Sequence, residues 1–467
     1  MPHVSSPFSI PGDVPAVADA PREATRHWWG WFELFAASQL LWGVLLFVPG
    51  VQPYRMYIRA LPYVASLAAL LFATRRSPGE PLPSSSGWLL ASFALLAASL
   101  LHPDTHPKAG LAQLMFQISI AAPMFWAASS VRSPLRLARL MGVIFAASLV
   151  SAAIGVLQVY YPGVFLPPEF SALARSLNPA IVDALSYVGP DGRSIIRPPG
   201  LSDLPGGAAV AGLTTVVLGI AHISHEGHHK LVRILSVGAV TVGMTALYLT
   251  QVRALTVMAA IGVLAFAAVR LRQGRILQGG WVAVGGVALV AASFLWAAAI
   301  GGKAIEDRFS GLIQSGLFDT YQQSRGLFLE YTLRELLFQF PLGAGLGRWG
   351  MMPVYFKDPS MWQAPLIHVE IQITGWLLDG GVLMWLFYGG ALASAGRLAY
   401  VSAIKRSTNW LRYLSASVLA FQFAIVGVCL AGPVFNTQLG MVFWTVTGAL
   451  SGAMRAWNRS EPGQTDD

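Results

Sequence analysis

The chain is poor in charged residues, and this scarcity indicates its class. Only 11% of its 467 residues are charged, and 55% are hydrophobic, whereas an average soluble domain is about 25% charged. This composition excludes an ordinary soluble enzyme and predicts a membrane protein. The formal net charge of +9 is explained by basic residues in the short loops of one side, so no nucleic-acid partner is expected.

Cysteine is almost absent as well. The single cysteine, Cys429, lies in an apolar run, so no disulfide within the chain can hold an outer loop. The first thirty residues have no basic start, no short apolar segment and no small-residue cleavage site, so no cleaved signal peptide is expected. Residues before 25 and after 459 are predicted to be disordered tails.

Long apolar runs, in contrast, are abundant. Runs that approach the length needed to cross a hydrocarbon core of about 30 Å lie at residues 31–48, 57–73, 87–101, 111–128, 140–160, 205–223, 231–250, 254–269, 281–300, 369–392, 411–431 and 434–454. None alternates with a two-residue period, so helices are expected rather than barrel strands. The sequence therefore predicts an all-α integral membrane protein with about 12 transmembrane helices.

The distribution of basic residues predicts the orientation of these helices. If the N-terminus is cytoplasmic, the connections on that side hold more than half of the 31 Lys and Arg residues in short loops, as the positive-inside rule requires. The membrane domain would span residues 31–455, between cytoplasmic tails at 1–30 and 456–467. Long periplasmic loops are predicted at about 161–204 and 301–367, and chemistry that needs water is expected there.

The second of these loops ends beside a histidine. A helix is predicted at 323–340, because apolar residues recur there at i, i+4, i+7 and i+11, and we expect it to lie near the membrane plane. The glycines of Gly343-Ala-Gly345-Leu-Gly347 allow close backbone approach. His368 follows at the junction with the next span, where an imidazole can accept a proton.

Arginines also gather on the predicted outer face. They are Arg193, Arg197, Arg253, Arg325 and Arg348. Guanidinium forks bind phosphate oxygens bidentately, so arginines that converge would suit a diphosphate. For Arg253 taken alone, the simpler interpretation is an arginine that snorkels to the interface.

Four segments, in order, resemble the O-antigen ligase and polysaccharide polymerase superfamily. Arg197-Pro-Pro-Gly200, followed by Pro205, looks like the Arg-x-x-Gly segment of that family. Val252-Arg253-Ala254-Leu255 resembles its arginine that opens a span after a short polar turn. Arg325, leading through a helix to the glycine-rich turn, and the segment from His368 to Gly381 are similar to its last two motifs.

The resemblance implies a GT-C-like glycosyltransferase that moves glycans from undecaprenyl diphosphate at the periplasmic face of the bacterial inner membrane. His368 would take the proton of an acceptor sugar hydroxyl. Arg197 and Arg253 would hold the diphosphate, with Arg193 and Arg325 as further candidates. The implied partners are the undecaprenyl-diphosphate-linked glycan, an acceptor that is a second glycan or lipid A-core, and membrane lipids; no metal or other cofactor is implied.

The chain also departs from the family's pattern. Gly206 and Val252 stand where the family usually has asparagine and often serine. An ungapped alignment of Asp379-Gly-Gly381 places Glu370, not His368, at the histidine position. His368 is favoured as the base because imidazole is largely neutral at periplasmic pH. Glu370 stays an alternative base, and it also suits a helix start, where the macrodipole favours a carboxylate.

Two other functions compete with this interpretation. His225-Glu226-Gly-His-His229 has the H-E-x-x-H spacing of a zinc intramembrane metalloprotease, but the segment is polar and predicted to be cytoplasmic. A transporter would show inverted repeats and charges at the midplane, and only Asp379 lies inside a predicted span. For Asp379 we expect a structural role, as a helix cap or in a bond to another helix.

Overall fold

A computed structural model describes most of the chain. The described residues are 30–48, 50–76, 81–166, 186–189, 191–202, 206–225, 229–314, 316–350, 352, 356, 367–404 and 408–460. These residues are mainly helical. Eight helices are long and apolar enough to cross a membrane, so the prediction of a multi-pass helical membrane protein is confirmed.

The eight helical segments account for most of the predicted spans. They are Arg55–Ala73 in α2 (Arg55–Arg76), Pro107–Ser130 over α4 (Pro107–Ala121) and α5 (Pro123–Ser130), α6 (Pro134–Tyr160), α11 (Lys230–Leu249), α12 (Arg253–Arg272), α13 (Ile276–Gly301), α19 (Gln372–Ile404) and α20 (Asn409–Val428). The other four predicted runs are also helical, in α1 (Trp31–Leu41) with η2 (Trp42–Phe47), α3 (Ser86–Ser99), α10 (Ala208–Ser224) and α21 (Gln438–Ser460). The number of twelve spans stays a prediction. Helix α21 runs five residues past position 455, where we expected the cytoplasmic tail to begin.

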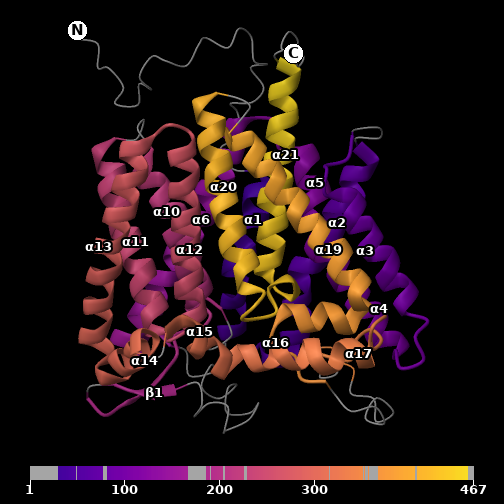
Figure 1. Cartoon of the computed structure of the whole chain (residues 1–467), viewed down its shortest axis with the longest axis horizontal. Coiled ribbons are helices and arrows are strands. Elements are labelled where there is room, and N and C mark those ends of the chain that lie inside the picture. The colour runs from indigo at the N-terminus through magenta and orange to yellow at the C-terminus, as the bar shows by residue number, and fades with distance from the viewer. Residues whose placement is uncertain are drawn as a thin grey trace.

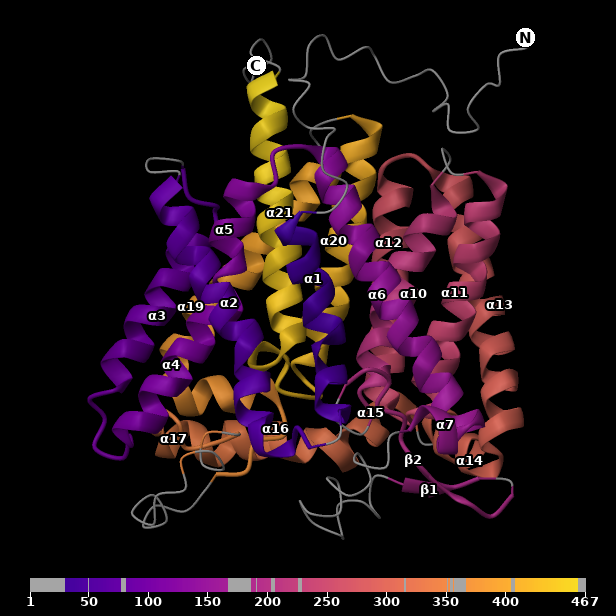
Figure 2. The same cartoon turned by 180° about the vertical axis from the view of Figure 1, so that it is seen from behind.

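The helices stand side by side, and shorter helices run across one end of the bundle (Figures 1 and 2). Helices α6 and α10 to α13 form one side, α2 to α5 form the other, and α20 and α21 lie between them, while α19 runs obliquely from beside α3 to beside α20. Across one end run α14 (Lys303–Gln314), α15 (Gly316–Tyr321), α16 (Leu327–Tyr331) and α17 (Leu337–Gln339). The C-terminal end of α21 lies at the opposite end.

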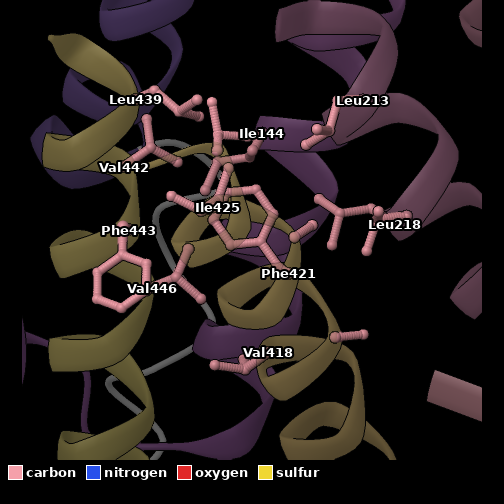
Figure 3. Packing of buried hydrophobic residues seen from close by; sticks show 14 of the residues in the cluster. Ile144, Leu213, Leu218, Val418, Phe421, Ile425, Leu439, Val442, Phe443 and Val446 are labelled. Carbon is pink, nitrogen blue, oxygen red and sulfur yellow. The ribbon is translucent and has the colours of Figure 1, made fainter. Parts of the chain in front are cut away.

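Small residues allow the helices of the bundle to approach closely. A Cβ atom on Gly212 of α10 would lie 2.6 Å from the carbonyl oxygen of Gly243 on α11. One on Gly452 of α21 would lie 2.3 Å from the carbonyl oxygen of Val131. Such close contact is how helices pack in lipid, where no hydrophobic effect drives them together. Figure 3 shows the resulting core, in which α20 side chains interdigitate with those of α6, α10 and α21.

The outer surface of the bundle is apolar as well. Only 11% of the most apolar window of α13 is buried inside the protein, although its mean hydropathy is 2.1. Trp281, Val284 and Val287 are exposed there. A helix that is hydrophobic all round yet poorly covered by protein is expected to face lipid.

The loop predicted at 301–367 is mostly helical where the structure describes it. Helix α14 follows α13 after Gly302, and helical structure continues from Gly316 to Gln339. The helix predicted at 323–340 is therefore present, but it begins seven residues earlier. It contains two π turns, η4 (Gln322–Gly326) and η5 (Thr332–Leu336), which an apolar periodicity of 3.6 residues does not reveal.

A kink in α19 receives the glycine-rich turn that follows this helix. Gly380 and Gly381 have non-helical backbone angles, and the amide of Val382 donates to the carbonyl of Pro341 at 3.0 Å. Gly381 has φ of +66°, and a Cβ atom there would lie 2.1 Å from that same carbonyl oxygen. The close approach expected of the glycine-rich turn also occurs, since a Cβ atom on Gly343 would lie 3.1 Å from the amide nitrogen of Gly380, and one on Gly347 would lie 2.7 Å from the carbonyl carbon of Ala109. These contacts fix the helical stretch 316–339, which we call the crossing helix, against α19.

The loop predicted at 161–204 contains a hairpin that the sequence did not suggest. After α7 (Pro162–Phe165), strand β1 (Ser186–Val188) pairs antiparallel with β2 (Ser194–Ile196), with Tyr187 opposite Ile195. Residues 167–185 lie outside the described part. The short 3₁₀ segments η3 (Gln52–Tyr54) and η7 (Val434–Asn436) complete the fold.

Candidate functional site

Two groups of polar side chains lie at the end of the bundle that carries the crossing helices and the hairpin. We call Arg197, Arg253 and Arg308 the arginine group. His368, Glu370 and Arg325 are called the histidine group. Each is built from segments far apart in the sequence.

Arg197 is positioned by a backbone segment that is fastened to α6. The Gln158 side chain donates from Nε2 to the carbonyl of Gly200 and accepts from its amide at Oε1, both at 2.9 Å. The amide of Leu201 donates to Ser151 Oγ at 3.1 Å. Gly200 has φ of +63°, and a Cβ atom there would lie 2.7 Å from the Ser151 carbonyl oxygen. The glycine of the Arg-x-x-Gly segment is therefore needed for this close seat, which fixes the arginine three residues before it.

Arg253 begins α12 after a tight turn. Gln251 in that turn has φ of +56°, the one positive value outside glycine among the described residues. Such a conformation is costly for a residue with a side chain and persists only where its surroundings enforce it. Here the Gln251 side chain donates from Nε2 to the carbonyl of Ala304 at 3.4 Å. The turn that presents Arg253 is thereby tied to α14.

Arg308 joins Arg197 and Arg253 from α14. It lies four residues after Ala304, so both residues are on one face of that helix. The charge of Arg308 acts on Arg197 and on Arg253 alike. Burial and the charge of Arg308 together lower the pKa of Arg197, although a guanidinium remains protonated throughout the physiological range.

The arginine group has no counterion in the described part of the chain. None of the three side chains forms an ion pair there, and the Nε atoms of Arg197 and Arg308 are buried without a hydrogen-bond partner. Like charges that are half-buried and unpaired oppose folding. Their convergence is therefore better explained by an anionic ligand than by stability.

Tyr187 places a neutral donor beside this group. Its side chain is only 8% exposed, and its hydroxyl has no hydrogen-bond partner among the described residues. Burial raises the pKa of the hydroxyl, and the charge of Arg197 opposes that rise. The phenol therefore stays protonated and can donate one hydrogen bond.

The histidine group joins the first half of the crossing helix, where Arg325 lies, to the residues just before α19. Arg325 forms an ion pair with Glu370. Glu370 Oε1 lies 2.6 Å from Nε2 of His368, and the His368 side chain is 73% exposed. Burial lowers the pKa of Arg325, although a guanidinium keeps its charge throughout the physiological range. The imidazole of His368 is therefore exposed to solvent, and its Nε2 is held by Glu370.

Each π turn of the crossing helix has a side chain that bonds at or just before the start of α19. Arg325 lies in the first, and Thr332 in the second, where its Oγ1 is 2.5 Å from Oγ1 of Thr374 on α19. A π turn widens the helix by one residue and so re-aims side chains, which explains why such turns occur often at functional sites. The crossing helix is thus joined at two points to the segment that contains Glu370 and the first turn of α19.

The other arginines of the predicted face lie elsewhere. Arg193 is exposed in the hairpin turn and pairs with Asp191 at 3.2 Å. Arg348 is buried and bonds to Asp104 and to the carbonyl of Ala344. Of the five predicted arginines, only Arg197 and Arg253 share a charged neighbour, Arg308, and their role at a diphosphate stays a prediction. Arg193 and Arg348 have local partners, and Arg325 belongs to the histidine group.

Asp379 and the histidine-rich segment have structural surroundings. The Asp379 carboxylate accepts hydrogen bonds from Trp349 Nε1 at 2.8 Å and from Gln113 Nε2 at 3.5 Å, so it bonds to another helix, one of the two structural roles expected for it. His225 directly follows α10, and its ring packs on Trp410 and Tyr413. His229 caps α11 instead. The two histidines therefore do not lie one turn apart on a single helix, and residues 226–228 between them lie outside the described part.

Sequence reasoning missed Arg308 and Tyr187. Arg308 lies in an amphipathic segment with Lys303, Glu306 and Asp307, where a charged residue is ordinary. Tyr187 lies in a short strand without a motif. Neither position carries a local signal, because both are selected by contacts between distant segments.

Comparisons with known proteins give no family. No family model matches the sequence, and a search of curated proteins finds no match.

Proposed function

We propose that this chain transfers a glycan from undecaprenyl diphosphate to an acceptor sugar hydroxyl at the periplasmic face of the bacterial inner membrane, in the assembly of O-antigen or another surface polysaccharide. The observation that supports this most is the arginine group. Its three guanidinium groups lack a counterion in the described residues and lie beside the start of α12, where the headgroup of a lipid-linked substrate would be held. Guanidinium forks match diphosphate oxygens.

The histidine group supplies the complementary chemistry. Because Nε2 of His368 lies 2.6 Å from Glu370 Oε1 and Glu370 is paired with Arg325, we assign the imidazole proton to Nε2, which leaves Nδ1 of His368 to accept the proton of the acceptor hydroxyl. Glu370 then positions the base rather than competing for its role. Attack on the anomeric carbon from the side opposite the diphosphate would invert that centre.

Fixed positive charges would stabilise the departing diphosphate. Gln158 fastens the backbone segment that carries Arg197, and Gln251 fastens the turn that carries Arg253. The guanidinium groups of these two arginines would therefore need little rearrangement as negative charge develops, which is the basis of preorganised electrostatic catalysis. The proposal includes no metal ion or other cofactor.

The alternatives have less support in the described residues. A zinc protease would need His225 and His229 on one helix, and a break between α10 and α11 separates them. A transporter would need ionisable groups near the middle of the bundle, whereas Asp379 lies beside the kink of α19 that receives the glycine-rich turn and is bonded to Trp349 and Gln113.

One reconstitution tests the proposal and separates its two forms. Purified protein is incubated with an undecaprenyl-diphosphate-linked repeat unit, with and without lipid A-core, and the products are sized. A ladder formed from the donor alone identifies a polymerase, and a product that requires lipid A-core identifies a ligase. The variant His368→Ala is the matched control and should form neither. No product from the unaltered protein under any of these conditions would overturn the proposal.

A further inference from the structure

Arg308 differs from the other members of the arginine group in its origin. Arg197 and Arg253 lie in two of the segments by which the donor site was predicted, whereas Arg308 comes from α14. Its charge nevertheless acts on both of them, and its buried Nε has no partner among the described residues. Glu306 and Asp307 are exposed and too near in sequence to face it across the helix.

The charge of the diphosphate changes during the proposed reaction. In the donor, both phosphates are esterified, one to the polyprenol and one to the sugar. The acceptor oxygen forms a bond to the anomeric carbon, its proton passes to His368, and the bond from that carbon to the diphosphate oxygen breaks. The electron pair of the broken bond stays on the diphosphate, whose terminal phosphate then carries up to about one further negative charge.

The geometry points to Arg308 as the group that binds this released charge. The inference rests on the proposed function, because it assigns a role within that same site. Two guanidinium groups suit the two charges of the donor, and the third suits the charge that appears on bond breaking. A group that interacts more strongly with the leaving diphosphate than with the donor lowers the barrier of the chemical step.

With this role, replacement of Arg308 should change lipid binding and turnover in a way that replacement of another basic residue does not. Replacing it should weaken binding of undecaprenyl diphosphate more than binding of the glycan-linked donor. It should also lower kcat with little change in KM. Replacing Arg253 should weaken binding of both lipids to a similar degree.

The test measures direct binding of both lipids to the full-length protein in lipid nanodiscs. The variants are Arg308→Gln, Arg308→Lys, Arg253→Gln and, as a matched control, Lys303→Gln, which removes an exposed charge from the same helix. We expect Arg308→Gln to lose about ten- to hundredfold in affinity for undecaprenyl diphosphate and much less for the donor. Arg308→Lys keeps the charge without the fork, so it should lose less, and it serves if the glutamine variant is misfolded.

The outcomes distinguish a failure of the proposed glycan transfer from a failure of the role of Arg308 alone. If the unaltered protein binds neither lipid, both the proposed function and this inference are overturned. If it binds both but Arg308→Gln weakens them equally or not at all, only the inference is overturned. The same holds if Lys303→Gln reproduces the effect, because the effect would then be one of overall charge.

Discussion

The arginine group and the histidine group lie at the same end of the bundle, and they differ in how their charges are balanced. In the histidine group, Arg325 and Glu370 neutralise each other, and Glu370 also holds His368. In the arginine group, three positive charges have no acidic partner in the described residues. The charges of the histidine group are balanced without a ligand, whereas those of the arginine group would be balanced only by a bound anion.

This difference suggests that the two groups have separate roles. A paired set fixes the position and protonation state of a side chain, as a base requires. An unpaired set keeps its binding capacity for an anion that arrives later, at a cost to stability before it arrives. The histidine group should therefore affect turnover, and the arginine group should affect both donor binding and stability.

The largest expected effect separates turnover from binding. His368→Ala and Glu370→Gln should each lower the rate of glycan transfer, by about 10²- to 10⁴-fold for the loss of a general base, with the histidine change the more severe. Donor binding should be retained in both. Arg253→Gln, in contrast, should lose donor binding. Transfer assays and donor binding on the same preparations check this.

Two results would count against these separate roles of the histidine group and the arginine group. Full activity in His368→Ala would remove the histidine from the mechanism. Near-normal activity in His368→Ala together with complete loss in Glu370→Gln would make Glu370 the base, as the ungapped alignment suggested.

The next effect concerns the seat of the arginine group. Gly200→Ala should displace Arg197, because the new Cβ would meet the Ser151 carbonyl oxygen at 2.7 Å, and crowding of this kind costs about 1–3 kcal/mol. Gly192→Ala is the matched control, since Gly192 also has positive φ, +75°, but has no atom within 4 Å of the added Cβ.

Donor affinity and thermal unfolding of the two variants give the comparison. We expect reduced donor affinity in Gly200→Ala alone. Equal losses in both variants would mean that backbone strain, and not the position of Arg197, is responsible.

The sequence predicts the parts of this molecule that depend on local pattern. Apolar runs predicted the helices, because a helix in lipid needs a continuous hydrophobic surface. Arg197 and Arg253 were predicted from their place on the outer face and from short segments that resemble a known family, and their role stays a prediction. The crossing helix was found from its periodicity, although its π turns were not.

The rest depends on contacts that no local pattern encodes. Arg308 reaches the site because Gln251 bonds to Ala304, a contact across 53 residues. His368 and Glu370 looked like alternatives in the sequence, and the structure bonds them to each other. Which arginines converge is decided by packing, so Arg193 and Arg348, equally plausible by position, have separate partners.

Stability offers a subtler contrast between the groups. Removing one of three like charges relieves repulsion, so Arg253→Gln should unfold at a slightly higher temperature in the absence of ligand. Arg325→Gln should unfold at a lower temperature, because it leaves the Glu370 charge without its arginine. Both effects should be about 1 kcal/mol or less, since these side chains are partly exposed.

Thermal unfolding in the same detergent checks the signs of these changes. Raising the salt concentration should shrink both changes, because ions screen exposed charges. Destabilisation by Arg253→Gln would mean that the arginine group is balanced by a partner and would weaken the comparison.

The smallest effect tests whether Tyr187 belongs to the arginine group. Tyr187→Phe removes only the hydroxyl, which has no partner among the described residues, so the fold should lose nothing and unfolding should be unchanged. If the hydroxyl donates to the diphosphate, donor affinity should fall about two- to tenfold, the range of a single hydrogen bond. Tyr248→Phe is a matched control, because the Tyr248 hydroxyl donates within the protein, to the carbonyl of Val290 at 3.3 Å; that variant should lower stability and leave donor affinity unchanged. The reverse pattern would place Tyr187 in the packing of the hairpin and leave the arginine group without a neutral donor.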